Sequence, residues 1–286
     1  MKTHSECLSC LMKQSTALLG RLNLQEKTND KIIDAISRAI GETDPTQSPP
    51  LLMGEIHRMI KDVTGLVDPY EKAKQNCNLN VMKFNDDWRE LIDGSSNPLL
   101  SSVQLAIAGN IIDLAVDPNA DQANIKTAAM ESLAAVIPAS VLAKFVNDVN
   151  NASKILYLGD NAGEIVFDRL LLELLPVEKI TFVVRGQPVI NDVTLVDAHV
   201  TGITNLVRVI DNGSDLPGTV LSMCSEPFQR EFHEADLVIA KGQGNFESLN
   251  EEKKNIFFLF KVKCSVVEEI TGYPIGTHVF MNIHSL

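Results

Sequence analysis

Five short runs rich in Ile, Val, Leu and Phe occupy the second half of the chain, and the segments between them are long enough to form helices. The runs are residues 154–159, 179–186, 205–211, 235–242 and 255–263. Between the first two runs, Glu164–Leu175 has the apolar periodicity of a helix. Short apolar strands that alternate with helices are typical of a parallel sheet covered on both faces. From Ser153 onward, the sequence therefore predicts an α/β/α sandwich.

The first half of the chain has the pattern of successive helices. Apolar periodicity and turn residues predict helices at Cys7–Leu22, from a cap at Asn29 or Asp30 to Ile40, at Leu51–Thr64, after Asp68-Pro69, at Leu99–Val116, near Asp121–Ala135 and near Pro138–Val149. Asp44–Pro50 and Gly94–Pro98 are expected to be loops. The fold class is therefore α/β, with a helical domain over residues 1–96 and an α/β/α domain over residues 97–286.

Composition restricts the class of partner. A net charge of −12 argues against a nucleic-acid surface, because binding a phosphate backbone needs a basic patch. The start of the chain lacks the apolar core of a signal peptide, and no apolar run approaches the roughly 20 residues of a membrane helix. A cytoplasmic protein without nucleic-acid or membrane partners is expected, and its oligomeric state is left open.

Polar and charged residues follow four of the predicted strands. They are Asp160, Asn161 and Glu164 after the first strand, Arg185, Gly186, Asn191 and Asp192 after the second, Asp211 and Asn212 after the third, and Lys241, Gly242, Gln243, Gly244, Asn245 and Glu247 after the fourth. Ligands of open parallel sheets bind beyond the carboxyl ends of the strands. The four strand ends are therefore expected to meet in one cleft.

The residue types in this cleft suit a metal ion and a phosphate group. Asp160, Asn161 and Asp192 offer hard oxygen ligands for Mg²⁺, Mn²⁺ or a similar ion. Lys241 and the backbone amides of the glycine-rich turn around Gly242 could meet phosphate charge, aided by neighbouring helix N-termini. The chemistry that these parts favour is metal-assisted hydrolysis of a phosphate ester, with Asp192 or Glu164 orienting the water.

Each of these residues also has a simpler structural interpretation. Asp160 could cap a helix, and Asp192 could cap a helix that starts near Val193. Lys241 could be a solvated lysine. Asp211 and Asn212 are interpreted as turn residues. Two further polar residues, Asn110 and Asp113, share one face of an otherwise apolar helix, where they either bond within the core or line the cleft.

The cysteines allow two interpretations. Cys7 and Cys10 lie one helical turn apart, and with Cys264 they could form a metal or redox site. No second pair with this spacing supplies the further ligands of a structural zinc site, so small buried side chains are the alternative. The scattered, odd-numbered set of five cysteines fits reduced thiols better than disulfides.

With these residues identified, the sequence resembles the damage-control phosphatase family with the ARMT-like metal-binding domain, formerly domain of unknown function 89, in its small stand-alone microbial branch. The matching segments span the chain: Glu6–Gln14, Ala106–Asp113, Leu158–Asp168, Arg185–Thr194, Lys241–Leu249 and Lys261–Cys264. The resemblance implies a helical portion joined to a Rossmann-like α/β/α domain with a mainly parallel sheet. It also implies a divalent-metal-dependent phosphatase, using Mn, Ni, Co or Mg, that acts on small phosphorylated metabolites.

The resemblance further implies roles for particular residues. The metal ligands would be Asp160, Asn161 and Asp192, and these with Lys241 would be the catalytic set. The residues that contact or line the substrate site would be Glu164, Lys241, Asn110, Arg185, Gly242 and Asn245.

Two other functions are kept as alternatives. One is an S-adenosylmethionine-dependent carboxyl methyltransferase, although Asp160-Asn161 stand where such a turn needs Gly, and Arg185-Gly186 follow the second strand instead of an acid. The other is a binding protein for a metal or phosphometabolite, without turnover. A nicotinamide dehydrogenase is disfavoured because no G-x-G-x-x-G follows a predicted strand.

Overall fold

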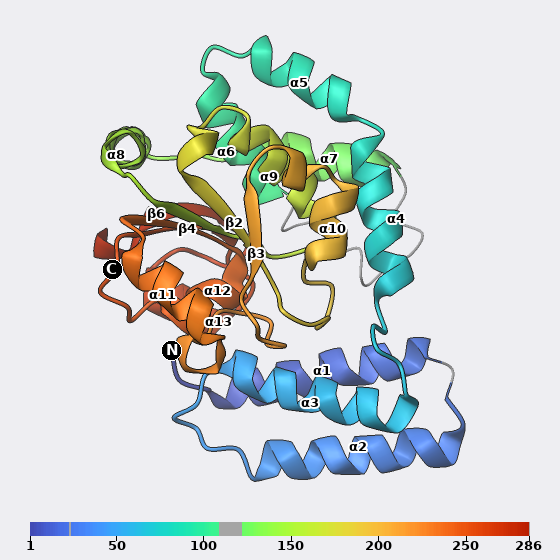
Figure 1. Cartoon of the computed structure of the whole chain (residues 1–286). Helices are drawn as coiled ribbons and strands as arrows, with labels where there is room; N and C mark the ends of the chain where they lie inside the picture. The colour runs from blue at the N-terminus through green and yellow to red at the C-terminus, as the bar shows by residue number, and fades with distance from the viewer. Residues whose placement is uncertain (23, 109–121, 286) are drawn as a thin grey trace.

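The computed structural model of the chain describes residues 1–22, 24–108 and 122–285. A six-stranded sheet forms its centre, with the strand order β3-β2-β1-β4-β5-β6. The strands are β1 (Ile155–Leu158), β2 (Ile180–Val184), β3 (Arg208–Asp211), β4 (Leu237–Lys241), β5 (Ile256–Lys261) and β6 (His278–Asn282). All neighbours pair in parallel except β6, which is antiparallel to β5. The predicted α/β fold with a mainly parallel sheet is confirmed (Figure 1).

Helices cover both faces of this sheet. One face carries α4 (Glu71–Met82), α5 (Asn85–Asp93), α6 (Pro98–Ala108), α7 (Gln122–Leu133), α8 (Ala139–Asn151), α9 (Glu164–Leu172) and α10 (Leu195–Val200). The other face carries α11 (Glu226–Glu234), α12 (Gly242–Leu249) and α13 (Ser265–Thr271). The central strands are apolar on both faces because both are buried, which explains the continuous apolar runs of the sequence.

Side-chain alternation along the strands distributes the core between the two faces. Ile155 and Tyr157 of β1 belong to the apolar cluster on the α9 face, whereas Leu156 and Leu158 belong to the cluster on the α12 face. This period of two follows from the pleat of a strand. A shift of β1 by one residue would exchange the two sets, so the packing specifies the register.

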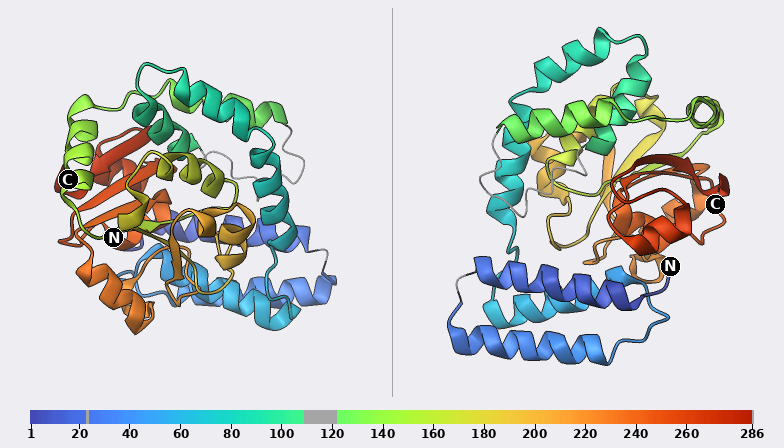
Figure 2. Two further views of the ribbon diagram at one scale, coloured as in Figure 1. Left: turned by 45° about the horizontal axis from the view of Figure 1, so that its top comes forward. Right: turned by 180° about the vertical axis from the view of Figure 1, so that it is seen from behind.

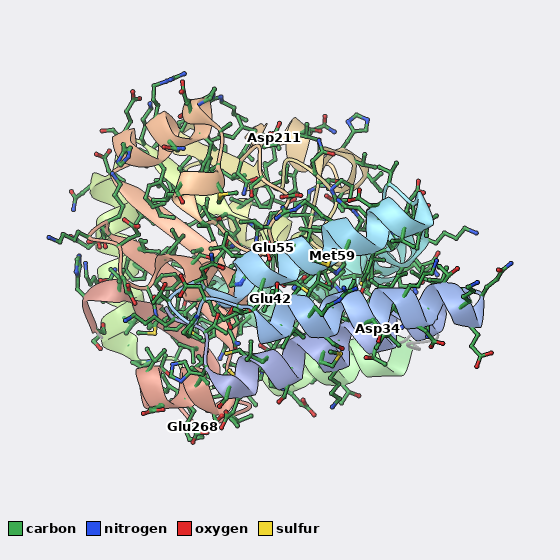
Figure 3. The ribbon with its side chains drawn as sticks, turned by 90° about the horizontal axis from the view of Figure 1, so that it is seen from below. Asp34, Glu42, Glu55, Met59, Asp211 and Glu268 are labelled. Carbon is green, nitrogen blue, oxygen red and sulfur yellow. The ribbon has the colours of Figure 1, made fainter. Side chains whose placement is uncertain are left out.

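Three further helices form a separate layer at one end of the molecule. These are α1 (Ser5–Arg21), α2 (Glu26–Gly41) and α3 (Pro49–Thr64), packed around their own apolar cluster, which includes Leu18, Ile36 and Ile56. Figure 2 shows this layer from two further sides, and Figure 3 shows it from below, with Asp34 on α2 and Met59 on α3 labelled.

Polar contacts tie the three-helix layer to the loops of the sheet. Arg58 on α3 forms an ion pair with Asp215 at 2.7 Å, and the Lys61 ammonium donates to the carbonyl of Pro188 at 3.0 Å. Both partners lie in loops that follow strands at the carboxyl edge of the sheet. The layer therefore stands opposite that edge, where a ligand of such a sheet binds.

Several predicted boundaries differ from the structure. The helix α2 begins at Glu26 after the N-cap residue Gln25, and Asn29 lies inside it. The segment that begins at Gly242, predicted as a glycine-rich turn, is the first turn of α12, and the antiparallel strand β6 was not predicted. For α12 and β6, packing in the sheet and against it outweighs the local preference of turn residues, whereas α2 packs against α1 and α3. The C-terminal part of the predicted helix Leu99–Val116, with Asn110 and Asp113, lies outside the described residues.

In the described part of the chain, no helix combines the length and the apolar character needed to cross a membrane.

The stability of the three-helix layer should depend on pH through His57. This side chain is buried in α3 beside the ring of Tyr70, with ring centroids 6.0 Å apart. Burial, with a smaller contribution from Lys61, lowers the pKa of His57 to about 4. The unfolded chain therefore binds more protons between about pH 6.5 and pH 4, so stability falls as the pH falls through that window. Thermal unfolding should show a loss of up to about 3 kcal/mol from this residue.

The His57→Gln variant isolates this contribution. Between pH 7 and pH 4.5, its melting temperature should fall less than that of the wild type, because Gln does not titrate. Parallel curves for the two proteins would contradict the assignment.

Candidate active site

A cavity of about 520 Å³ lies between the carboxyl ends of the strands and the three-helix layer. Its inner wall carries Asp160 and Asn161, which follow β1, and Asn191 and Asp192, which follow β2. Its outer wall is formed by side chains of α1 and of the first turns of α3. In the sheet, the chain order reverses between β1 and β4, and this switch point is where ligands of such sheets bind.

Main-chain hydrogen bonds hold the loops after β1 and β2 together. The amide of Ala162 donates to the carbonyl of Asn191 at 2.9 Å, and the amide of Val193 donates to the carbonyl of Asp160 at 2.8 Å. These bonds form an isolated antiparallel bridge between the two loops. The side chains of Asp160, Asn161 and Asp192 are therefore brought together by the backbone.

Burial controls the protonation of the two carboxylates. The pKa of Asp160 is raised to about 7, first by burial and then by the nearby Glu164 carboxylate, while Arg185 acts in the opposite direction. The pKa of Asp192 is also raised to about 7, first by burial and also by Asp160, again against the effect of Arg185. A cation between the two carboxylates would lower both pKa values, because positive charge stabilises the ionised form.

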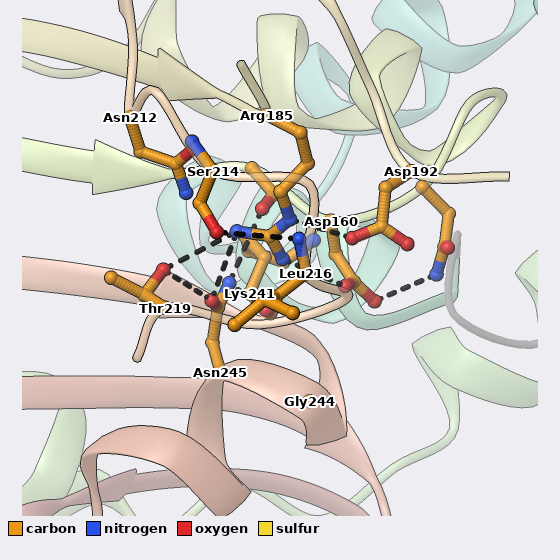
Figure 4. A network of polar contacts seen from close by, with 12 residues as sticks. Asp160, Arg185, Asp192, Asn212, Ser214, Leu216, Thr219, Lys241, Gly244 and Asn245 are labelled. Atoms are coloured by element: carbon orange, nitrogen blue, oxygen red, sulfur yellow. Dashed lines mark hydrogen bonds and ion pairs between the residues drawn. The ribbon is translucent and has the colours of Figure 1, made fainter. Parts of the chain in front are cut away.

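Arg185 lies beneath both carboxylates and joins them to the loop after β3 and to α12 (Figure 4). Its Nε donates to Asp192 Oδ2 at 2.6 Å, and its Nη2 lies 3.7 Å from Asp160 Oδ1. Its Nη1 donates at 3.3 Å to both Thr219 Oγ1 and Asn245 Oδ1. The guanidinium therefore orients the two acids from the protein side and leaves the cavity side to a ligand.

A second charged cluster lies deeper, under α9. The ammonium of Lys241 is fully buried and donates to Glu164, to Asp168 Oδ1 at 2.7 Å and to the carbonyl of Ala106 at 2.7 Å. The hydroxyl of Tyr157 also donates to Asp168 Oδ1, at 2.7 Å. Although burial acts to lower the pKa of Lys241, its two carboxylate partners raise it, so this lysine stays protonated.

The structure places Glu164 and Lys241 differently from the expectation of direct substrate contact. Neither side chain lines the cavity, and all three N–H groups of Lys241 are taken by protein acceptors. Asn161 connects the two clusters, because its Nδ2 donates to Asp160 Oδ2 at 2.7 Å and to Glu164 Oε2 at 3.3 Å. The sequence indicated that these residues follow strands, but it could not indicate which side chains turn back beneath the sheet edge.

Asn245 and Gly242 also lie behind the cavity wall, whereas Gln243, Gly244 and Glu247 line the cavity. Asn245 is buried inside α12, where its Nδ2 donates to the carbonyls of Gly159 at 3.2 Å and Lys241 at 2.7 Å. Gly242 begins α12 with φ 78°, and a Cβ there would lie 1.9 Å from Asp160 Oδ2. Asn110 lies outside the described residues. Asp211 ends β3, and Asn212 begins the turn that follows; both side chains accept hydrogen bonds from backbone amides of that turn.

Besides Asp168 of the deeper cluster, the sequence analysis missed Ile190 and Thr219. Ile190 lines the cavity with φ 41°, a left-handed conformation that is strained for a β-branched residue and is found mainly at functional sites. Its side chain packs against the core of the three-helix layer. Thr219 bridges Arg185 and Asn245. No motif marks either position, because both roles depend on contacts between distant segments.

The donor set of the inner wall fits a divalent cation. Asp160, Asp192 and the amide of Asn161 supply the oxygen ligands that Mg²⁺ and Mn²⁺ prefer. The two clusters together hold four buried carboxylates against the two buried cations Arg185 and Lys241, so two negative charges lack a buried partner when all four carboxylates are ionised. A divalent ion would neutralise this excess of negative charge. The exposed Lys263 also contributes positive charge, but solvent screens it.

The thiols provide no comparable site. Cys7, Cys10 and Cys264 all line the cavity, so the three sulfurs share one wall. Within residues 1–22, 24–108 and 122–285, however, no group of three or more His, Cys, Asp or Glu side chains is arranged to hold a metal ion. The five cysteines are free thiols, and burial is the main cause that raises the pKa of Cys7 and Cys264.

Fold and site together define a Rossmann-like α/β protein with two carboxylates and an amide at the switch point of its sheet. The model of the damage-control phosphatase ARMT1-like domain matches residues 3–279. The chain therefore belongs to this family.

Relatives and a solved structure agree with this membership. The chain is 35% identical to an uncharacterized protein of Methanocaldococcus jannaschii, covering 98% of this chain and 95% of that protein. It is 30% identical to a damage-control phosphatase of Archaeoglobus fulgidus and 29% identical to one of Pyrococcus horikoshii, covering 98% of each chain in both comparisons. The crystal structure of a DUF89 family protein from Pyrococcus horikoshii superimposes with a TM-score of 0.89 and 28% identity, over 99% of both chains.

The Gly242→Ala substitution should displace the Asp160 carboxylate and weaken metal binding. Gly272→Ala is the matched control, because Gly272 has φ 72° and nothing within 4 Å of an added Cβ. The control should lose only the roughly 1–2 kcal/mol of a strained left-handed residue. Gly242→Ala should lose more stability and should also weaken Mn²⁺ binding, measured by calorimetry. Equal effects of both substitutions on Mn²⁺ binding would contradict the close approach to Asp160.

The Lys241→Met substitution should destabilise the fold by about 3–5 kcal/mol near pH 8, because it leaves Glu164 and Asp168 buried without a cation. The loss should become smaller toward pH 6, since the folded protein then binds protons at carboxylates whose pKa is raised. Denaturant unfolding at several pH values measures both effects. Lys254→Met, which removes a surface ammonium bonded to the His233 carbonyl, should cost less than about 1 kcal/mol at every pH.

Proposed function

We propose that this protein is a divalent-metal-dependent phosphatase that hydrolyses phosphate monoesters of small metabolites. The observation that carries the proposal is the pairing of two buried carboxylates and an amide, from adjacent strand ends, at the wall of a cavity. The names of the relatives from Archaeoglobus fulgidus and Pyrococcus horikoshii support the reaction class.

The metal ligands in this proposal are Asp160, Asn161 and Asp192. These oxygen donors suit Mg²⁺, Mn²⁺, Co²⁺ or Ni²⁺. A divalent cation bound there would polarise the phosphoryl oxygens and lower the pKa of a water molecule at the site. Because the ligands come from two loops joined by backbone bonds, little rearrangement is needed to present them.

Arg185 keeps the ligand carboxylates in position from below. Its bond to Asp192 Oδ2 leaves the other oxygen of that carboxylate available on the cavity side. Asp192 is therefore a better candidate than Glu164 for orienting the attacking water, because Asp192 lines the cavity and Glu164 is fully buried. In this proposal Glu164 acts through Asn161, because its carboxylate accepts a hydrogen bond from the Asn161 side-chain amide.

Lys241 contributes to the reaction as a buried positive charge. With its three N–H groups bonded to the protein, it stabilises ionised Glu164 and Asp168 beneath the metal ligands. In this role Lys241 limits the negative charge beneath the metal ligands, which would otherwise oppose a phosphoryl group in the cavity. For Lys241 to contact the substrate, as the sequence analysis expected, at least one of its three hydrogen bonds to the protein would have to be replaced by a bond to the substrate.

The test is release of inorganic phosphate from a panel of phosphate monoesters, after chelation and after each of Mg²⁺, Mn²⁺, Co²⁺ and Ni²⁺ is added back. The wild-type protein should be inactive after chelation and active with at least one metal. Asp160→Asn should lower kcat by about 10³-fold or more, since it removes a ligand that acts at the reacting centre.

Asp160 is preferred to Asp192 for this test, because removing Asp192 would leave the Arg185 guanidinium buried without its closest partner. Asp211→Asn, at an exposed turn, is the control and should keep wild-type activity. Metal-independent phosphate release, or full activity of a folded Asp160→Asn variant, would refute the proposed site. Metal binding without release from any ester would favour a binding protein.

A further inference from the structure

The cavity extends far beyond the space that a phosphate group and a metal ion need. The residues of α1 that line it lie on one face of the helix, singly or in adjacent pairs that recur every three or four positions: Glu6, Cys7, Cys10, Leu11, Lys13, Gln14, Ala17 and Arg21. At about 1.5 Å per residue, Cys7 to Arg21 spans roughly 20 Å of the helix. A volume of about 520 Å³ lies in the range of sites that enclose molecules of drug size. The cavity therefore accommodates a substrate whose alcohol part is long.

Two cations on this face lack a partner. Lys13 and Arg21 are exposed to the cavity, and neither side chain has an ion pair or hydrogen bond among the residues that the structure describes. The lining also carries two acids that are not paired with these cations: Glu6 of α1 accepts a hydrogen bond from the neutral Ser265 hydroxyl, and Glu247 of α12 accepts one from the neutral Gln243 Nε2 at 2.8 Å. In a chain with a net charge of −12, free positive charge on this wall points to an anionic ligand.

The cavity surface apart from these cations and the metal ligands is mostly hydrocarbon. Leu11, Pro49, Pro50, Met53, Tyr70 and Ile190 line it. Such a surface binds the carbon skeleton of a ligand, while the few charged groups at its margins set the orientation. The wall thus offers charge for a second acidic group at a distance from the site of the phosphate.

We propose that Lys13 and Arg21, about 12 Å apart along α1, are alternative contacts for a second anionic group, so that the preferred substrate is a phosphate monoester whose alcohol part ends in a carboxylate or a second phosphate. This inference rests on the proposed function, because Asp160, Asn161 and Asp192 hold the first phosphate through the metal. The hydrocarbon wall binds the chain between the two anions. Monoesters without the second anion bind only through the phosphate and the chain.

The test compares the binding of compounds that differ only in the second anion. Isothermal titration calorimetry with Mn²⁺ present measures the affinities of n-alkyl phosphonates and of ω-carboxyalkyl phosphonates of the same chain length. Phosphonates are not hydrolysed at the carbon–phosphorus bond, so the readout is independent of turnover. At a chain length that reaches the cations, the carboxylate should improve Kd about tenfold or more, the effect of a charge-assisted hydrogen bond. Alkane-α,ω-bisphosphonates in a second arm determine whether a phosphate is preferred to a carboxylate.

The double variant Lys13→Ala/Arg21→Ala should abolish this preference and leave the Kd of the n-alkyl series unchanged. The single variants show which cation serves a given chain length, because the two lie about 12 Å apart along the helix. Lys31→Ala, an exposed lysine on α2 that does not line the cavity, is the matched control and should keep the preference. High salt should reduce the preference, because exposed charges are screened.

The outcomes separate this inference from the proposed function. If alkyl phosphonates bind with metal and neither second anion improves Kd at any length, the subsite is refuted and the metal site stands. A preference that survives in the double variant also refutes it. If no phosphonate binds in the presence of metal and no ester is hydrolysed, the proposed function fails, and the subsite fails with it.

Discussion

The buried ion pair between Arg185 and Asp192 is the contact on which the rest of the site depends. The two side chains meet at 2.6 Å in a place where both are almost fully buried, and the same guanidinium faces Asp160 at 3.7 Å. Arg185 opposes the effect of burial on the pKa of both carboxylates and so favours the ionised form that binds a metal. The flat guanidinium faces Asp192, Asp160, Thr219 and Asn245 from three separate nitrogens, whereas a lysine would place a single nitrogen among them. Arg185 thereby links the loops after β1 and β2 to α12 through Asn245.

The deeper cluster also pairs buried acids with a buried cation. Lys241 faces Glu164 and Asp168, and Asn161 connects this cluster to the acids of the cavity wall. The site thus consists of acids on the cavity side and cations on the protein side, with a negative excess that a divalent ion can neutralise. Burial makes this arrangement costly for the fold, and such cost is typical of functional sites. The three-helix layer closes the cavity from outside and anchors Ile190 in its strained conformation.

The sequence predicted the α/β class, most helices of the first half and five of the strands, because apolar periodicity reports directly on burial. It also indicated that residues after β1, β2 and β4 meet at one edge, since the carboxyl ends of parallel strands share an edge. It missed β6, whose pairing with β5 is a contact between separate segments, and it interpreted the start of α12 as a turn because of Gly242 and Gly244. The roles of Asp160, Asn161 and Asp192 as metal ligands remain predictions that rest on this placement.

The sequence by itself determined which residues follow the strands and that their chemistry suits a metal and a phosphate. Only the tertiary structure decided which of them face the cavity. Asp160, Asn161 and Asp192 do, whereas Glu164, Arg185 and Lys241 lie beneath. The tertiary structure also placed Lys13 and Arg21, from the first helix, on the wall opposite the strand ends. The physical reason is that local patterns determine secondary structure, whereas the direction of a side chain at a strand end depends on the charges and the packing supplied by distant parts of the chain.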